Sequence, residues 1–337
     1  MTRIPITGIG VIAPAAIAAI DRFDTSGLSA HTAALVRDFK PKDYIAPMKM
    51  RRMNALSRFA VASAKLAIAD CGAALPPNTG VAMGTAFGPV QTSVDYMQEY
   101  VEKGAALAPP QLFAESVANA PGSHIAIEWG LRGFNVTITQ RESSALAAAM
   151  YACAQLAKGT VDAALIGGVD EVNEMLFSVL DRIGALDDAQ LDGMVIGEGS
   201  AMLVAGGAGS REPYAYFSGF GIARDATATI SDWGSDPASV VTAMRAAIDD
   251  AEIAVTDIDA VYVSANGSRR CDALEASALG ALFGANMPEL VNTKKIFGEY
   301  AAGGALQIVE AVRNGKGHVL VNSISAGGGI VCAVISR

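Results

Sequence analysis

The chain has 337 residues, 51% of them hydrophobic and 18% charged, and its 25 Lys+Arg against 34 Asp+Glu give a formal net charge of −9. High hydrophobicity with a low charge fraction excludes an intrinsically disordered chain. The acidic balance argues against a general nucleic-acid-binding protein, because phosphate contacts require a basic surface. A chain of this length can bury a large core and form two lobes.

The N-terminal region is apolar but interrupted. The uncharged stretch 4–20 contains Pro5, Gly8, Gly10 and Pro14 and is short for a membrane span, which needs about 20 apolar residues. A strand followed by a glycine turn is therefore favoured over a signal peptide or a membrane span. The four cysteines have no metal-type spacing, so we expect buried, reduced thiols in a cytoplasmic protein without a metal site.

Short apolar or β-branched segments alternate with Ala-rich segments along the whole chain, which is typical of an α/β layered fold. The predicted strands are 4–11, 80–83, 135–139, 163–166, 200–204, 215–221, 260–263, 318–323 and 330–336. The predicted helices are 54–71, 121–129, 143–158, 237–251, 272–282 and 302–313.

The sequence contains a weak internal repeat. Residues 6–11 (Ile-Thr-Gly-Ile-Gly-Val) are similar to residues 217–222 (Phe-Ser-Gly-Phe-Gly-Ile), and each opens a run of alternating strands and helices. We therefore expect two duplicated halves, 1–199 and 200–337, with 182–199 as the crossover between them. No Pro/Ser-rich linker separates the halves, so they should form one packed unit.

The strand 135–139 breaks abruptly into an Ala-rich helix, which predicts a strand-to-helix elbow. Free backbone N–H groups and the helix dipole favour negative charge at such a point. Enzymes place a cysteine thiolate there because the same field lowers the thiol pKa. In this chain the residue at the elbow is Glu142.

Several segments, in the expected order, resemble those of the β-ketoacyl synthases, the condensing enzymes of the thiolase superfamily. The matching segments are 6–14, 133–146, 166–170, Asp192-Gly193 with 197–199, Lys294 with Gly298 and 301–305, and Asn322-Ser323 with 327–329. The resemblance implies an α/β, thiolase-like, layered αβαβα fold made of two duplicated halves. It implies no bound cofactor, since the substrates arrive on the phosphopantetheine of an acyl carrier protein.

The family works with one cysteine and two histidines, and the resemblance places these three positions at Glu142, Asn266 and Glu299. The family's lysine corresponds to Lys294 and its gating phenylalanine to Ala326. All three catalytic groups would then be missing. The histidines present, His31, His124 and His318, match none of the family's loops, and Cys153 lies inside a predicted helix, so packing roles are favoured.

Two interpretations of Glu142 remain open from the sequence. At a helix N-terminus its pKa should be lowered, and an ion pair with Arg141 or Lys294 would close an inactive pocket, since buried charges must be paired. Alternatively, Glu142 and Glu299 form a pair of carboxylates that has been adapted to acid–base chemistry on an acyl thioester.

Family members without the cysteine resemble chain length factors, which pair with an active ketosynthase and typically carry Gln at this position. The first hypothesis is therefore a catalytically silent subunit in a heterodimer with an active ketosynthase. The pair would work in type II elongation of fatty acid, polyketide or polyene chains, with an acyl carrier protein as second partner. The alternatives are an enzyme acting through Glu142 and Glu299, and a non-catalytic module that binds an acyl chain or a carrier protein.

A basic run stands out against the acidic total. Six cationic residues lie between Lys40 and Arg58, with only Asp43 opposing them. Lys49, Arg51 and Arg52 are candidates for docking an acidic carrier protein, although a solvated loop has the same composition. The methionines of 48–53 and the edge strand 135–139 are candidates for a dimer interface.

Overall fold

The computed structural model describes residues 2–186, 193–209, 212–230 and 232–337. These residues form a ten-stranded mixed sheet with the order β10-β9-β11-β12-β8-β1-β7-β6-β4-β5. The strands of the N-terminal half are β1 (Ile4–Ile12), β4 (Thr79–Gly84), β5 (Asn135–Ile138), β6 (Ala163–Asp170) and β7 (Gly199–Gly206). Those of the C-terminal half are β8 (Ala215–Arg224), β9 (Ile258–Tyr262), β10 (Glu289–Val291), β11 (His318–Ile324) and β12 (Gly329–Ser336).

The two halves of the sheet repeat the same order and the same strand directions. From the outer edge inward, the halves read β5-β4-β6-β7-β1 and β10-β9-β11-β12-β8. In each half the outer two contacts are parallel and the inner two antiparallel. Antiparallel pairing of β1 with β8 joins the halves into one sheet. The duplicated fold expected from the sequence is confirmed.

The predicted crossover at 182–199 is wrong. Strand β7 follows that segment and lies between β1 and β6, so the chain completes the N-terminal half before it passes to β8 through residues 207–214. The expected boundary between the halves, after residue 199, therefore falls at the start of β7, a strand of the N-terminal half. Residues 187–192, which include Asp192 of the Asp-Gly motif, lie outside the described residues.

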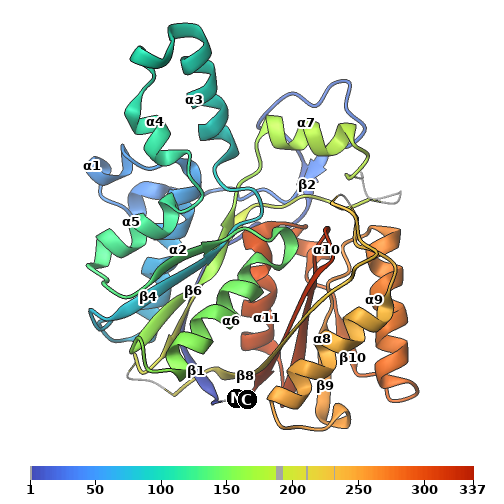
Figure 1. Cartoon of the computed structure of the whole chain (residues 1–337). Helices are drawn as coiled ribbons and strands as arrows, with labels where there is room; N and C mark the ends of the chain where they lie inside the picture. The colour runs from blue at the N-terminus through green and yellow to red at the C-terminus, as the bar shows by residue number, and fades with distance from the viewer. Residues whose placement is uncertain (1, 187–192, 210–211, 231) are drawn as a thin grey trace.

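The helices complete an αβαβα arrangement (Figure 1). Helices α6 (Ser144–Ala157) and α11 (Ala305–Asn314) share one core with residues from both halves of the sheet. On the outer faces, α2 (Ala55–Cys71) and α5 (Ala120–Trp129) cover the N-terminal half, and α8 (Pro237–Asp250) and α9 (Arg269–Phe283) cover the C-terminal half. Four alanines of α6, at positions 145, 148, 149 and 152, are fully buried, and their small side chains let this helix approach the sheet closely.

Several shorter elements were not predicted. Helices α3 (Val90–Lys103) and α4 (Pro110–Glu115) project from the body, as does α7 (Glu174–Arg182) (Figure 1). The remaining elements are short: α1 (Pro47–Met50), α10 (Lys294–Phe297), β2 (Ala18–Ala19), β3 (Thr32–Ala33) and the 3-10 turns Pro41–Asp43, Ala105–Leu107, Arg141–Ser143, Val255–Asp257 and Ala301–Gly304. Among the described residues, no helix has both the length and the apolar character that crossing a membrane requires.

The repeated Gly-x-Gly has a packing cause. A Cβ on Gly10 would lie 1.9 Å from the Ser63 carbonyl oxygen of α2, and one on Gly221 would lie 2.0 Å from the Ala243 carbonyl oxygen of α8. Both obstacles are backbone atoms, which cannot rotate away. Each strand therefore needs glycine where it lies against its own following helix.

Gly221→Ala is expected to lower the free energy of unfolding by about 1–3 kcal/mol, because the added methyl group must push β8 and α8 apart. Urea denaturation measures the loss. The matched control is Gly280→Ala, in the exposed face of α9, where nothing lies within 4 Å of an added Cβ. That control should gain about 0.5–1 kcal/mol from helix propensity. Equal stabilities for the two variants would contradict the close-approach argument.

Candidate functional site

Glu142 lies at a sharp elbow between β5 and α6. Strand β5 ends at Ile138, a single 3-10 turn spans Arg141–Ser143, and α6 begins at Ser144. Arg141 has a φ of 48°, in the left-handed region that non-glycine residues rarely adopt. Such backbone strain persists only where surrounding contacts hold it, and here Ser144 Oγ accepts a hydrogen bond from Gln140 N–H (2.8 Å).

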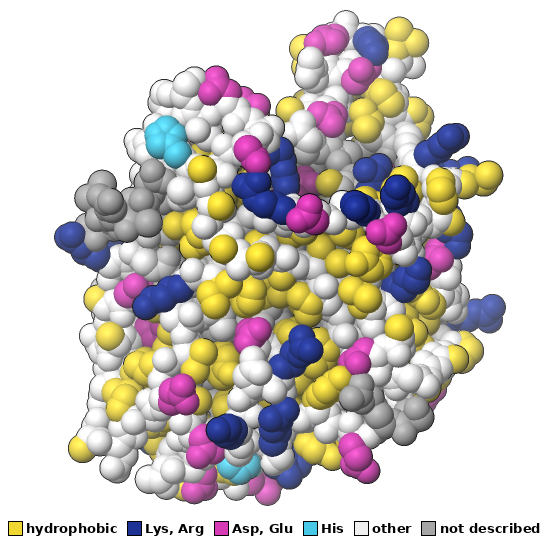
Figure 2. All heavy atoms as spheres, turned by 180° about the vertical axis from the view of Figure 1, so that it is seen from behind, with side chains coloured by type: hydrophobic (Ala, Val, Ile, Leu, Met, Phe, Trp, Pro, Cys, Tyr) yellow, Lys and Arg dark blue, Asp and Glu magenta, His cyan; other side chains and the backbone are white. Residues whose placement is uncertain are grey.

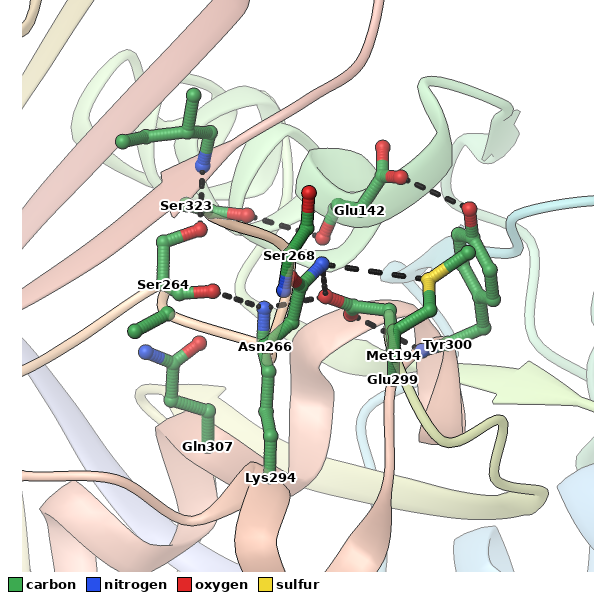
Figure 3. Close-up of polar contacts among 12 residues, drawn as sticks. Glu142, Met194, Ser264, Asn266, Ser268, Lys294, Glu299, Tyr300, Gln307 and Ser323 are labelled. Carbon is green, nitrogen blue, oxygen red and sulfur yellow. Dashed lines mark hydrogen bonds and ion pairs between the residues drawn. The ribbon is translucent and has the colours of Figure 1, made fainter. Parts of the chain in front are cut away.

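The Glu142 carboxylate is closed off from solvent. The residue is 1% exposed. Its Oε1 accepts a hydrogen bond from the Tyr300 hydroxyl (2.9 Å) (Figure 3). Its Oε2 accepts one from Ala326 N–H (3.1 Å). Arg141 Nε lies 3.8 Å from Oε2 and supplies the nearby positive charge. The sequence analysis expected an ion pair of Glu142 with Arg141 or with Lys294, and the structure has the contact with Arg141, at a distance longer than a hydrogen bond.

The pKa of Glu142 moves in the direction opposite to that expected from the sequence. Burial and, to a smaller extent, the negative charge of Glu299 raise this pKa to about 7, and Arg141 offsets only part of their effect. A helix N-terminus contributes about 0.3–1 kcal/mol in favour of the charged form. Removing a carboxylate from water can raise a pKa by several units, so desolvation prevails here.

A second buried group contains Lys294, Glu299 and Asn266. Glu299 Oε2 lies 2.7 Å from Lys294 Nζ and accepts a hydrogen bond from Asn266 Nδ2 (2.8 Å). Lys294 Nζ also donates to the Ser264 carbonyl oxygen (2.7 Å). Burial is the largest single effect and lowers the pKa of Lys294, but its neighbours, Glu299 foremost, together raise the pKa above its ordinary value.

The predicted Glu142–Lys294 ion pair is therefore wrong. Lys294 begins the short helix α10, and the chain returns to its Nζ five residues later with Glu299. Backbone hydrogen bonds hold Glu299 in this place: its N–H donates to Val195 O and its carbonyl accepts from Gly197 N–H, both at 2.7 Å. The lysine is thus neutralised by the nearer carboxylate.

Tyr300 connects the Glu142 carboxylate with the buried cluster of Lys294, Glu299 and Asn266. Its hydroxyl donates to Glu142, and its backbone N–H donates to Glu299 Oε1 (3.0 Å). The hydroxyl also accepts from Arg141 Nη2 (3.2 Å), and the ring packs edge-on against Phe87 with centroids 4.8 Å apart. Tyr300 is 1% exposed and has a φ of 62°. The sequence analysis missed it, and its only signal was its place between Glu299 and the Gly/Ala-rich stretch.

The structure thus brings Glu142, Asn266, Lys294 and Glu299 together, with Ala326 directly at the carboxylate. Beside the turn that contains Ala326, between β11 and β12, lies a cavity of about 520 Å³, lined in part by Gln140, Arg141, Arg224 and Ala326.

The basic residues that the sequence suggested for docking a carrier protein lie away from Glu142 and its neighbours. Lys49, on α1, ion-pairs with Glu128 at 2.7 Å. Arg51 and Arg52 are exposed at the turn after α1 and line a different cavity. Lys and Arg side chains gather in the upper part of the rear face, near the projecting helices (Figure 2).

The histidines and Cys153 contact other parts of the molecule. His31 contacts Thr25, His124 contacts Glu115 (2.7 Å) and His318 contacts Ser336 (2.8 Å). Cys153 is fully buried within α6, and burial raises its thiol pKa well above the ordinary value. A thiol in that state is a poor nucleophile.

Comparisons with known proteins agree with this architecture. Two family models match the chain: Beta-ketoacyl synthase, N-terminal domain, over residues 16–205, and Beta-ketoacyl synthase, C-terminal domain, over residues 214–326. The 3-oxoacyl-(acyl-carrier-protein) synthase 2 of Coxiella burnetii is 27% identical, with 92% of this chain and 85% of that protein covered. The Tetracenomycin polyketide synthase ketoacyl synthase beta subunit of Streptomyces glaucescens is also 27% identical, with 96% and 88% covered.

Solved structures show the same fold. The ishigamide ketosynthase/chain length factor superposes with a TM-score of 0.88 at 23% identity, with 99% of each chain covered. The ketosynthase ApeO in complex with its chain length factor ApeC, from Xenorhabdus doucetiae, gives a TM-score of 0.82 at 18% identity, with 99% of this chain and 98% of that chain covered. With both family models matched across most of its length, the chain belongs to the β-ketoacyl synthase family.

Proposed function

We propose that this chain is a ketosynthase-like subunit that does not form the carbon–carbon bond itself and pairs with an active ketosynthase, as chain length factors do. One observation carries the proposal: the residue at the strand-to-helix elbow is Glu142, a carboxylate buried in a closed hydrogen-bond network. Covalent acyl transfer needs an activated nucleophile at such a point, and a thiolate is far more nucleophilic than a carboxylate.

The neighbouring groups support the same proposal. Condensation requires proton transfer and stabilisation of developing negative charge near the thioester. Asn266 carries no titratable proton, and Glu299 is neutralised by Lys294. The Ala326 N–H, a backbone donor facing the elbow, already donates to Glu142.

The partner in this proposal is a ketosynthase subunit, and β5 is the surface that fits it. Strand β5 ends the sheet, and its outer edge pairs with no other described strand. An edge strand can pair across a two-fold or pseudo-two-fold axis. The choice of partner is supported by a relative that is a ketoacyl synthase beta subunit and by two similar structures that contain a ketosynthase with a chain length factor.

Co-expression with an active ketosynthase tests the pairing. We expect one complex containing both chains, and exposure to an activated fatty thioester should place the acyl group on the partner's cysteine only. Intact-mass spectrometry of each chain shows which of them carries the acyl group. An acyl adduct on this chain alone, or a homodimer that binds none of the ketosynthases tested, would contradict the proposal.

A carrier protein is the second proposed partner, with Arg51 and Arg52 as its docking residues. Reversing both to Glu should slow carrier association at least about tenfold at low salt, because steering depends on local charge complementarity. Stopped-flow fluorescence measures the on-rate. The matched control, Lys158→Glu with Lys316→Glu, makes the same change in net charge at exposed positions elsewhere. Equal on-rates for both double variants would refute this docking site.

A second candidate function rests on the raised pKa of Glu142, about 7, which lies in the range that suits a general acid or base. In this alternative, Glu142 and Glu299 act on an acyl thioester. The isolated chain would then turn over a carrier-bound or coenzyme A thioester, and Glu142→Gln would abolish the turnover. Absence of turnover by the unmodified chain across both substrate types would exclude this candidate.

A further inference from the structure

The segments that flank the edge strand β5 carry positive charge at both ends. Residues 130–141 include Arg132 and Arg141 and no acidic residue. Arg132 lies three positions before Asn135, the first residue of β5, and Arg141 lies three positions after Ile138, the last residue. Both flanks of the edge are therefore cationic, in a chain whose net charge is −9.

The Arg132 side chain is available to a partner. It is exposed and forms no ion pair with a described residue. The backbone N–H of Arg132 donates to Pro77 O (2.7 Å), so the main chain holds this segment in place. A substitution of the side chain leaves that hydrogen bond intact.

The charge of Arg141 is balanced only in part. Its Nη1 and Nη2 donate to neutral oxygens, Ile230 O (3.1 Å) and the Tyr300 hydroxyl (3.2 Å). Glu142 lies 3.8 Å from Nε, but burial raises the pKa of that carboxyl group to about 7 and keeps part of it protonated.

A third arginine lies beside Arg141. Arg224, at the end of β8, lines the same cavity of about 520 Å³, and no carboxylate of a described residue lines it with them. Arg224 is exposed and forms no ion pair within the described part of the chain. The carboxylates of the adjoining loop are engaged elsewhere: Asp225 accepts from backbone N–H groups of its own loop, and Asp232 lies 3.2 Å from Arg270.

A second copy of this chain does not suit this edge. Antiparallel pairing along the whole of β5 would place Asn135 of one copy opposite Ile138 of the other. Continued outward, the same register places Arg132 of one copy opposite Arg141 of the other, beside Arg224, at both ends of the paired strands. Like charges directly opposite each other destabilise an antiparallel pair.

We infer that the edge of β5 selects against a second copy of this chain and in favour of a ketosynthase strand flanked by acidic side chains. One acidic group would lie opposite Arg132, and the other would enter the cavity of Arg141 and Arg224. The exposed Ile222, which lines this cavity, adds an apolar contact. The inference rests on the proposed function, which supplies the ketosynthase, and adds the repulsive and attractive charges by which partners are distinguished.

Charge reversal in the full chain tests the inference by sedimentation velocity. Arg132→Glu converts both like-charge contacts of a homodimer into opposite-charge contacts, so we expect its homodimer dissociation constant to fall at least about tenfold. Arg224→Glu should act in the same direction from the other side of the contact. General charge repulsion predicts the reverse, because each substitution makes an acidic chain more acidic.

A double variant and a control show whether the contact is specific. Arg132→Glu with Arg224→Glu again places like charges opposite each other, so the dissociation constant should return toward that of the unmodified chain. Arg245→Glu, at an exposed position of α8, makes the same change in net charge as each single variant and should not strengthen self-association. Circular dichroism checks that all four variants are folded.

The proposed partner gives an independent measurement. In the complex with an active ketosynthase, Arg132→Glu should weaken binding at least about tenfold at low salt, whereas Arg245→Glu should leave it unchanged. Self-association of both single variants no stronger than that of Arg245→Glu would overturn the inference. A double variant that associates more tightly than either single variant would also overturn it.

Failure of the proposed function is a different result. A chain whose single reversals dimerise as expected but which binds no ketosynthase would contradict the proposed function alone. A chain that pairs with a ketosynthase equally well with and without Arg132→Glu would contradict this inference alone.

Discussion

Lys294→Met is expected to lower the free energy of unfolding by about 3–5 kcal/mol, the cost of leaving one member of a buried ion pair without its partner. Glu299 is 2% exposed, so water cannot replace the ammonium group. Its remaining contacts, Asn266 Nδ2 and Tyr300 N–H, are neutral donors and cannot balance a full charge. Urea denaturation followed by circular dichroism measures the loss.

Two further variants separate the charge effect from lost packing. Adding Glu299→Leu to Lys294→Met should recover most of the stability, because no uncompensated charge remains. Lys49→Met breaks the exposed ion pair with Glu128 and should cost less than about 1 kcal/mol. If Lys294→Met costs no more than Lys49→Met, the buried pair does not stabilise the fold in the way its geometry indicates.

Strands were predictable from the sequence because burial on both faces leaves a continuous apolar pattern. The segment predicted as 163–166 is the start of β6, Ala163–Asp170, in which every residue is buried. Helix α3 was missed although its apolar residues Val90, Val94, Met97 and Val101 recur at helical spacing. Thr92 is its only buried residue, because this helix projects from the body and packs mainly on α4.

The positions of the candidate site were predictable, but their interactions were not. The order of segments located Glu142, Asn266, Lys294 and Glu299, and the structure brings all four together. Which carboxylate neutralises Lys294 depends on how the chain turns after α10, where Tyr300 adopts a left-handed backbone conformation. The charge state of Glu142 depends on total burial, which a local argument from the helix N-terminus does not include.

The stability of the folded chain is expected to decrease as pH rises from about 4.5 to 7, with Glu142 contributing about 3 kcal/mol of that decrease. The folded chain holds the Glu142 proton more tightly than the unfolded chain, since burial raises the pKa from 4.5 to about 7. The stabilisation is complete below pH 4.5 and is lost as pH passes through 7. Denaturation midpoints at intervals between pH 4 and 8 measure it.

Glu142→Gln should remove this contribution and flatten the pH profile, because glutamine stays neutral while its amide oxygen still accepts from Ala326 N–H. Glu171 titrates in the same range, its pKa raised to about 7 mainly by burial, so Glu171→Gln is the matched control and should remove only its own share. The two effects should add, because the two residues share no hydrogen-bond partner.

An unchanged profile in Glu142→Gln would mean that Glu142 is charged in the folded chain and that Arg141, at 3.8 Å, neutralises it. The elbow would then carry a fixed ion pair, and the acid–base alternative for this site would lose its physical basis.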